Sequence, residues 1–327
     1  MPSTREPTLE ELVAIVRAHP GLRNKAPIAL VSEVLGASDP VAGPGDDGAV
    51  IVDGDATLVV GGEALWPSFV EADPYAAGMA AVLANVNDLV AMGAYPLGIV
   101  DTIVGPESVA RPALLGMRFA SGLYQVPVVG GHLTLRDGPA AISAFGLGRV
   151  RGTAPVPVLS VANAGPGQHL IVACCTEGRM RPDFNFFGSF EERGPRLAGD
   201  VRLLPAMAAR GDCVAAKDIS MAGLVGSLAM LLEHRRLGAV VDLAALPVPP
   251  GVDLGAWLTT FTCFGFLLCS PPGRAEDCLA PFRERGLAAE VVGTLDASGQ
   301  IRLRVEGREA TVFDLRTESV TGLTAPR

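Results

Sequence analysis

The sequence contains very little lysine and has no excess of positive charge. Of its 26 basic residues only Lys25 and Lys217 are lysine, and the 35 acidic residues give a net charge of −9. A protein that binds nucleic acid needs a basic face, so the composition argues against a nucleic-acid partner. The acidic excess fits either solubility or metal binding.

No hydrophobic run is long enough to cross a membrane. A spanning helix needs about 20 apolar residues, whereas the longest runs, such as 223–232, end earlier at a charged or amide side chain. The first residues include acidic side chains and no apolar stretch before a small-residue cleavage site, which argues against a signal peptide. These absences predict a cytoplasmic protein with no membrane partner.

Paired cysteine motifs and short repeats are absent as well. None of the six cysteines belongs to a CxxC pair, and all lie in apolar segments, which predicts buried free thiols in a reducing compartment. The 39 glycines and 26 prolines follow no G-X-Y period, so a collagen-like chain is excluded. A hydrophobic content of 49% is too high for a disordered chain.

What the sequence does contain is an alternation of strands and helices. Its 327 residues allow roughly two domains, and the alternation in both halves indicates an α/β or α+β fold. The segment 151–167 is rich in proline, glycine and small residues and predicts a domain boundary. We therefore expect domains at 1–152 and 153–327.

Local signals place the elements. Asp53-Gly54-Asp55 between two apolar segments predicts a hairpin, and 73–93 predicts a helix with Asp73 as N-cap and Gly93 just past its end. The other expected strands are 97–104, 126–129, 140–150, 169–175, 213–219, 239–243, 261–270, 289–295 and 300–305. The other expected helices are 9–18, 28–35, 106–124, 196–210, 221–235, 253–258 and 273–285.

The first candidate site is the run Gly45-Asp46-Asp47-Gly48, which lies directly before a strand. Glycines let backbone N–H groups turn toward an anion. Paired carboxylates beside a phosphate suit Mg²⁺, which prefers oxygen ligands. The alternative interpretation is a solvated turn, because the same residues are common in turns.

The second candidate is the Asn85-x-Asn87-Asp88 cluster in the helix 73–93. At 3.6 residues per turn, Asn85 and Asp88 project away from the apolar stripe, and alanines lie alongside them. The side chains on this face are smaller and less charged than those of an ordinary solvent-exposed face. We therefore expect something to pack closely against it. The alternative is a helix–helix contact with a satisfied aspartate.

The third candidate is Gly130-Gly131-His132, where an apolar strand opens onto two glycines. Glycines at a strand end allow close backbone approach to a phosphate or ligand. His132 is then a candidate ligand or acid–base group. A lone histidine with a structural role is the alternative.

The fourth candidate is Lys217-Asp218 at the end of a strand, followed by Ser220 as the expected N-cap of the helix 221–235. The start of this helix is a candidate anion site. A charge pair at a strand edge is the alternative. The loop 176–195 between strand and helix is long for a connection, and its Arg179, Arg181 and Asn185 suit an anionic or polar substrate.

Taken together these motifs resemble the AIR synthetase (PurM)-like superfamily over nearly the whole chain. The runs that carry the resemblance are GDDGAV (45–50), VNDLVAMGAYPLGIVD (86–101), GGH (130–132), KDISMAGLVGSLAMLLE (217–233) and FGFLLCSPPG (264–273). The resemblance implies two domains, each a mixed sheet with helices, and a homodimer whose amino-terminal sheets join in a barrel. It also implies that ATP and Mg²⁺ bind in a cleft between the domains.

The resemblance also implies roles for the candidate residues. Asp46, Asp47 and Asp88 would hold Mg²⁺, with Asp218 as a further candidate, and Asn87 would line the ATP site with them. The turns that contain Gly45 and Gly48 and the turn at Gly130–Gly131 would cradle phosphates. Lys217 would lie near the transferred phosphoryl group, and His132 would serve the acceptor as an acid–base group.

The sequence departs from the thiamine-monophosphate kinase branch. That branch places acids where this chain has His132, Met221 and the run 262–264, so the resemblance is to the AIR synthase-related branch. We expect an ATP- and Mg²⁺-dependent enzyme, a ligase or phosphotransferase, that activates an amide or carboxylate oxygen by phosphoryl transfer. The alternatives are a small-molecule kinase, a non-catalytic nucleotide-binding dimer and a metal-dependent phosphohydrolase.

Overall fold

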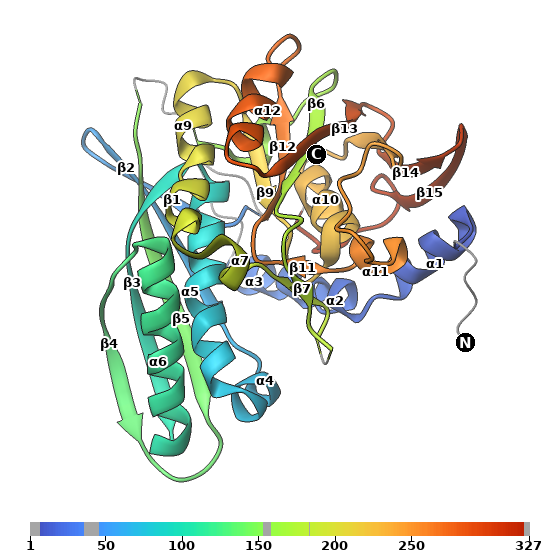
Figure 1. Cartoon of the computed structure of the whole chain (residues 1–327). Coiled ribbons are helices and arrows are strands. Elements are labelled where there is room, and N and C mark those ends of the chain that lie inside the picture. Colours follow the sequence, from blue (N-terminus) through green and yellow to red (C-terminus); the bar gives the residue numbers. More distant parts are fainter. Residues whose placement is uncertain (1–6, 36–45, 153–157, 183, 324–327) are drawn as a thin grey trace. The chain divides into compact units, whose positions relative to one another are not determined.

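The computed structural model describes residues 7–35, 46–152, 158–182 and 184–323 (Figure 1). The chain forms two compact units, each a sheet with helices, as expected from the alternation of elements. Unit 1 comprises Met1–Asp46, Leu159–Glu192 and Asp212–Arg327, and unit 2 comprises Asp47–Val158 and Arg193–Gly211. These units differ from two continuous domains in two segments: the amino-terminal helices belong to unit 1, and Arg193–Gly211 belongs to unit 2.

Unit 2 contains a five-stranded sheet and the helices that pack on it. Its elements are β1 (Ala49–Asp53), β2 (Ala56–Ala64), α4 (Pro67–Ala72), α5 (Pro74–Ala91), β3 (Ala94–Gly105), α6 (Glu107–Tyr124), β4 (Val128–Leu135), β5 (Ala141–Val150), η3 (Gly194–Arg196), α8 (Leu197–Asp200) and α9 (Leu203–Arg210). The strand order is β1-β2-β5-β3-β4. Only β3 and β4 pair in parallel.

The strongest local predictions in unit 2 are confirmed. The hairpin turns at Gly54, whose φ is +57°, between β1 and β2. The carboxylate of Asp73 accepts a hydrogen bond from the backbone N–H of Ala76 at 2.9 Å and caps α5. Gly93 follows the helix with a φ of +78°, a conformation that favours glycine. Helix α4 was not predicted.

Helices α5 and α6 pack on one face of the sheet and against each other (Figure 1). Two glycines allow this contact. A Cβ at Gly78 of α5 would overlap the carbonyl oxygen of Ala113, and one at Gly116 of α6 would overlap that of Tyr75. The two helix backbones are therefore in direct contact, and side chains larger than hydrogen cannot fit between them.

The opposite face of this sheet, which we call the open face, is apolar and exposed. Strand residues alternate between the two faces, so Ile99 and Ile103 of β3 are buried under the helices while Val100 points away and is 40% exposed. Phe145 and Leu147 of β5 lie on the same open face as Val100 and are also exposed. An exposed apolar surface of this kind is typical of a protein interface.

Unit 1 contains a seven-stranded sheet, a three-stranded sheet and surrounding helices. Its amino-terminal elements are α1 (Leu9–Ala18), α2 (Pro20–Arg23), η1 (Ala26–Ile28) and α3 (Ala29–Leu35). They are followed by η2 (Val161–Asn163), β6 (His169–Cys174), β7 (Arg179–Met180), β8 (Phe186–Gly188), α7 (Phe190–Arg193, whose last residue begins the second segment of unit 2), β9 (Ala215–Asp218), α10 (Gly223–Glu233), β10 (Gly238–Asp242), α11 (Leu254–Leu258), β11 (Phe261–Thr262), β12 (Gly265–Ser270), α12 (Ala275–Glu284), β13 (Ala288–Asp296), β14 (Gln300–Val305) and β15 (Arg308–Asp314). The large sheet has the order β15-β14-β10-β13-β6-β12-β9, and the small one has the order β11-β8-β7. Strands β7, β8 and β15 were not predicted.

The strands β6, β12 and β9 of the large sheet are buried on both faces. Leu267 and Cys269 of β12 join the core that contains α10. Phe266 alternates to the other face, where its ring lies 5.0 Å from Phe264, and Phe264 lies 6.3 Å from Phe282 of α12. All six cysteines are buried free thiols, as predicted. No described helix is long and apolar enough to span a membrane.

Candidate functional site

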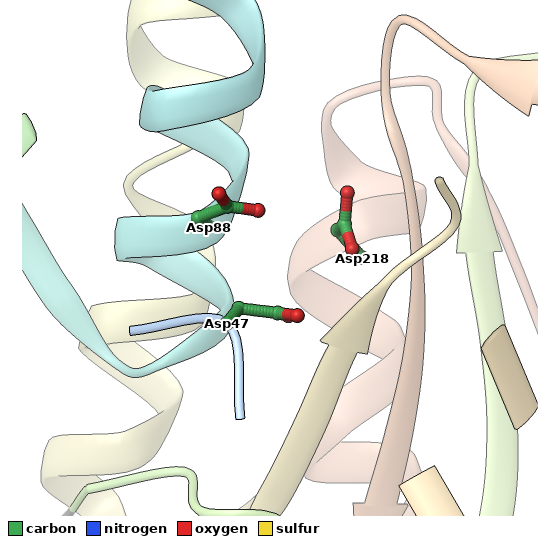
Figure 2. Close-up of side chains that lie close together, drawn as sticks. All are labelled: Asp47, Asp88 and Asp218. Atoms are coloured by element: carbon green, nitrogen blue, oxygen red, sulfur yellow. The ribbon is translucent and has the colours of Figure 1, made fainter. Parts of the chain in front are cut away.

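Two carboxylates of unit 2 come together at one end of its sheet. Asp47 directly precedes β1, and Asp88 lies in the last turn of α5. Each offers a carboxylate oxygen, and these atoms lie within 4.8 Å of one another (Figure 2). Both side chains are partly exposed, so the pair is open to a ligand. Figure 2 also draws Asp218, which belongs to unit 1.

The neighbouring residue on β2 is Gly61, which lies beside the pair. A Cβ at this position would lie 3.4 Å from the backbone oxygen of Asp47 and 3.9 Å from Oδ2 of Asp88. Two carboxylates and a backbone carbonyl near one open space form an all-oxygen set, which is what Mg²⁺ prefers. The residues therefore fit a hard divalent cation.

Asp46 does not point the same way as Asp47. Its Oδ2 accepts a hydrogen bond from the hydroxyl of Ser160 at 2.7 Å, and its Oδ1 accepts one from the backbone N–H of Val161 at 2.7 Å. Both carboxylate oxygens are therefore used within unit 1, next to η2. The structure joins Asp47, but not Asp46, to Asp88, and the role of Asp46 as a metal ligand stays a prediction. Gly45 lies outside the described residues.

Gly48 is required by packing. A Cβ at this position would lie 2.6 Å from a methyl carbon of Val59 on the neighbouring strand. Its glycine therefore allows the chain after Asp47 to enter β1 close to β2, which fixes the position of Asp47. A contact with phosphate by Gly48 stays a prediction.

The amides of the predicted cluster in α5 are buried. Asn85 donates hydrogen bonds to the carbonyl oxygens of Ala81 at 2.9 Å and Ala144 at 3.2 Å, which ties α5 to β5. Asn87 is only 1% exposed, and its role in binding a nucleotide is untested. The expected close packing against this face is confirmed, because a Cβ at Gly146 would lie 3.1 Å from Oδ1 of Asn85. Asp88 alone of the three is partly exposed.

The glycine pair at 130–131 does not form the expected turn. Strand β4 continues through both residues, and Gly131 pairs with Asp101 of β3. His132 pairs with Thr102 and therefore lies on the open face, with its Nε2 3.2 Å from Oγ1 of Thr134. Asp88, by contrast, comes from a helix on the covered face. The structure does not bring His132 and Asp88 together.

Gly131 has a different neighbour, Asp101, that no sequence motif indicates. A Cβ at this position would overlap Oδ1 of Asp101, a residue that is 7% exposed on the covered face. Burial raises the pKa of Asp101 above its ordinary value, because an uncharged carboxyl is easier to bury. The available signal was an acid at an inward position of the apolar strand 97–104.

Lys217 and Asp218 are both buried at the end of β9. As consecutive strand residues they point to opposite faces of the sheet, so they do not share one local site. Ser220 is not the N-cap of α10. That position is Ala222, and a Cβ at the next residue, Gly223, would overlap Thr259. The start of α10 is therefore packed against protein and is not an open anion site.

The loop 176–195 contains the hairpin of β7 and β8. Asn185 donates from Nδ2 to the backbone oxygen of Thr259 at 2.9 Å and accepts from the hydroxyl of Thr260 at 2.8 Å. Its amide fixes the loop rather than facing a substrate. Arg179 is exposed and lies 3.4 Å from a carboxylate oxygen of Glu192.

The fold and the site together define the class of this protein. It is an α/β chain of two units, with the carboxylate pair Asp47–Asp88 beside Gly61 of β2. Residues 45–150 match the family described as "AIR synthase related protein, N-terminal domain", and residues 189–306 match "AIR synthase related protein, C-terminal domain". An uncharacterized protein of Synechocystis sp. is 32% identical over 97% of this chain and 99% of its own length. The chain belongs to the AIR synthase related family, as predicted.

Solved structures have the same fold. Thermotoga maritima PurL, complexed with FGAR, superposes with a TM-score of 0.76 at 18% identity over 99% of this chain and 55% of its own length. AaThiL, complexed with AMPPCP and TMP, has a TM-score of 0.64 at 19% identity over 87% of this chain and 95% of its own length. The chain therefore spans about half of PurL and nearly all of ThiL.

Proposed function

We propose that this protein is an ATP- and Mg²⁺-dependent enzyme that activates an amide or carboxylate oxygen of a small molecule by phosphoryl transfer. The observation that carries the proposal is the Asp47–Asp88 pair beside Gly61, with carboxylate oxygens within 4.8 Å of one another. Relatives solved with ADP, ATP or AMPPCP support a nucleotide as the partner of this site.

In this proposal Asp47 and Asp88 hold Mg²⁺ through their carboxylates. The bound cation would neutralise charge on the phosphates, which is the main requirement of phosphoryl transfer. Gly48 and Gly61 keep β1 and β2 close and leave space beside the pair. Buried Asn85 fixes the register of α5 on the sheet, so that Asp88 is presented in one orientation.

We propose further that Asp218 supplies a third carboxylate from unit 1 when the nucleotide is bound. It ends β9 and is only 4% exposed, so its side chain is held in place. Mg²⁺ keeps several water or phosphate ligands and needs few from protein. Lys217, on the other face of β9, would support this strand end rather than touch the phosphoryl group.

The proposed acceptor is an amide or carboxylate and not a phosphomonoester. Transfer onto a phosphorylated acceptor usually needs a second set of metal-holding carboxylates. Asp47 and Asp88 of unit 2 form one such set. The positions expected to carry further acids are His132, which lies on the open face, Met221, and Cys263, which is fully buried.

Calorimetric titration with Mg·ATP tests the site. Asp47→Asn and Asp88→Asn each remove a charged ligand, and a charge-assisted contact contributes about 1.5–3 kcal/mol. We expect each variant to bind Mg·ATP roughly tenfold more weakly or worse. Gly61→Ala should weaken binding too, because its methyl group would enter the space beside the pair.

Matched controls are Asp53→Asn and Asp55→Asn, which remove carboxylates from the exposed hairpin tip. They carry the same change of charge and should bind Mg·ATP as the wild type does. Equal affinity in all five variants would reject the site. Equal loss in the hairpin variants would show that net charge, and not the pair, determines binding.

A further inference from the structure

A groove runs along the edge strand of the sheet in unit 2. It has a volume of about 420 Å³ and is lined by residues of α6 and β4: Glu107, Ala110, Arg111, Leu114, Leu115, Arg118, Leu133 and Leu135. Its four leucines are each 40–53% exposed. Helix α5 packs on β2, β5 and β3, and α6 packs on β3 and β4. The leucines on the outer side of α6 and β4 stay half exposed, so the groove is a place where a further helix would extend the layer.

The groove is also charged. Arg111 pairs with Glu107 on the same helix, whereas Arg118 has no ion-pair partner in the part of the chain that the structure describes. Arg118 is exposed beside Leu114 and Leu115. An occupant of this groove therefore needs an apolar stripe bordered by a negative charge.

Helix α3 of unit 1 has that pattern. Leu30, Val31, Val34 and Leu35 are 56–81% exposed and stand at positions i, i+1, i+4 and i+5, which form one stripe on a helix. Glu33 borders the stripe and has no ion pair within the described residues. A fully apolar stripe left in water is unfavourable, so α3 is a segment that needs a partner surface.

We propose that α3 of one copy docks in the α6–β4 groove of a second copy. The apolar stripe would cover the four leucines, and Glu33 would face Arg118. A short amphipathic helix in an apolar groove is a common mode of recognition. The contact is separate from the open face, because Leu133 and Leu135 lie on the helix side of β4. It does not depend on the proposed enzymatic activity.

Site-directed cross-linking of the full chain tests the contact. Val34→Cys and Leu114→Cys proteins are mixed and treated with a short bismaleimide, which reacts with the new thiols because the native cysteines are buried. We expect a covalent dimer of twice 33.7 kDa that contains one chain of each kind. Val34→Cys mixed with Asp55→Cys, at the hairpin tip, is the control and should give no product.

Charge reversal supplies a second measurement. In sedimentation experiments, Glu33→Arg and Arg118→Glu should each weaken self-association, roughly fivefold for an exposed charge pair, and the combined variant should restore it. Overturning results are no cross-link, or weakening that the combined charge variant does not restore. A protein that carries both Val34→Cys and Leu114→Cys tests the contact within one chain, and a cross-link found only within that single chain would also overturn the proposal. The last result would mean that α3 covers the groove of its own chain.

Discussion

The carboxylate of Asp101 lies directly beside the backbone of Gly131, so closely that a Cβ at position 131 would overlap it. The two residues are opposite each other in the parallel pair of β3 and β4. The carboxylate of Asp101 can therefore be buried on the covered face of the sheet because residue 131 is glycine.

This relationship predicts a pH-dependent gain in stability for Asp101→Asn. Burial raises the pKa of Asp101 in the folded protein, so the unfolded chain ionises first as the pH rises above its ordinary value of about 3.9. Stability is then lost as the pH rises through the folded pKa. The isosteric amide removes this loss.

We expect Asp101→Asn to match the wild type near pH 3, where the carboxyl is largely protonated in both the folded and the unfolded state, and to exceed it in denaturant midpoint at higher pH. Asp53→Asn, at an exposed position, should show no such divergence. A lower midpoint for Asp101→Asn at neutral pH would mean that the charged form makes a stabilising contact.

Two glycines of helix α6 should respond in opposite ways to alanine. Gly116→Ala places a methyl group against the carbonyl of Tyr75, and overpacking of this kind costs about 1–3 kcal/mol. At Gly122 nothing lies within 4 Å of the added Cβ, so alanine should stabilise the helix by about 0.5–1 kcal/mol. Chemical denaturation of both variants checks the pair, and changes of the same sign would contradict the described contact of α5 with α6.

The open face predicts a homodimer. Val100, Phe145 and Leu147 are exposed together on it, and a second copy would cover them. Light scattering at micromolar concentration should give twice 33.7 kDa, and Phe145→Asp should reduce the mass to one chain. Trp66→Gln, also an exposed large apolar residue, is the control and should leave the mass unchanged. A single-chain mass for the wild type would contradict the prediction.

Much of the local structure could be predicted from the sequence, because it depends on short-range signals. The cap at Asp73 and the turn at Gly54 are of this kind. The role of Asp47 and Asp88 as metal ligands stays a prediction. The points at which the chain passes from one unit to the other could not be predicted from such signals. The helix predicted at 196–210 packs in unit 2, although 153–327 was expected as one domain, because neighbours in sequence need not be neighbours in space.

The site shows the same limit. Asp46 and Asp47 are adjacent residues of the same type, so the sequence does not distinguish their roles. The structure shows that Ser160 and Val161 donate hydrogen bonds to the two carboxylate oxygens of Asp46. The glycines at 130–131 suggested a turn, whereas Gly131 is needed for the contact with Asp101 inside a continuous strand. That requirement comes from a neighbouring strand and leaves no local pattern.

The acceptor class gives a further prediction. The proposed nucleotide site has one set of metal-holding carboxylates. We therefore expect little or no formation of a diphosphate from thiamine monophosphate. Turnover of ATP should instead depend on an amide- or carboxylate-bearing compound together with an amine. Product analysis by mass spectrometry after incubation with each class checks this, and efficient diphosphate formation from a phosphomonoester would restore the kinase alternative.

The most direct test of the proposed reaction traces the acceptor's oxygen atom into the released phosphate. If the acceptor oxygen attacks the γ-phosphorus, ADP leaves, and a later displacement by the amine releases phosphate that carries that oxygen. With ¹⁸O-labelled amide or carboxylate compounds, Mg·ATP and an amine, we predict ¹⁸O in the released phosphate for the wild type and its loss in Asp88→Asn. Phosphate whose oxygens come only from ATP and water would contradict the account and identify the protein as a phosphohydrolase.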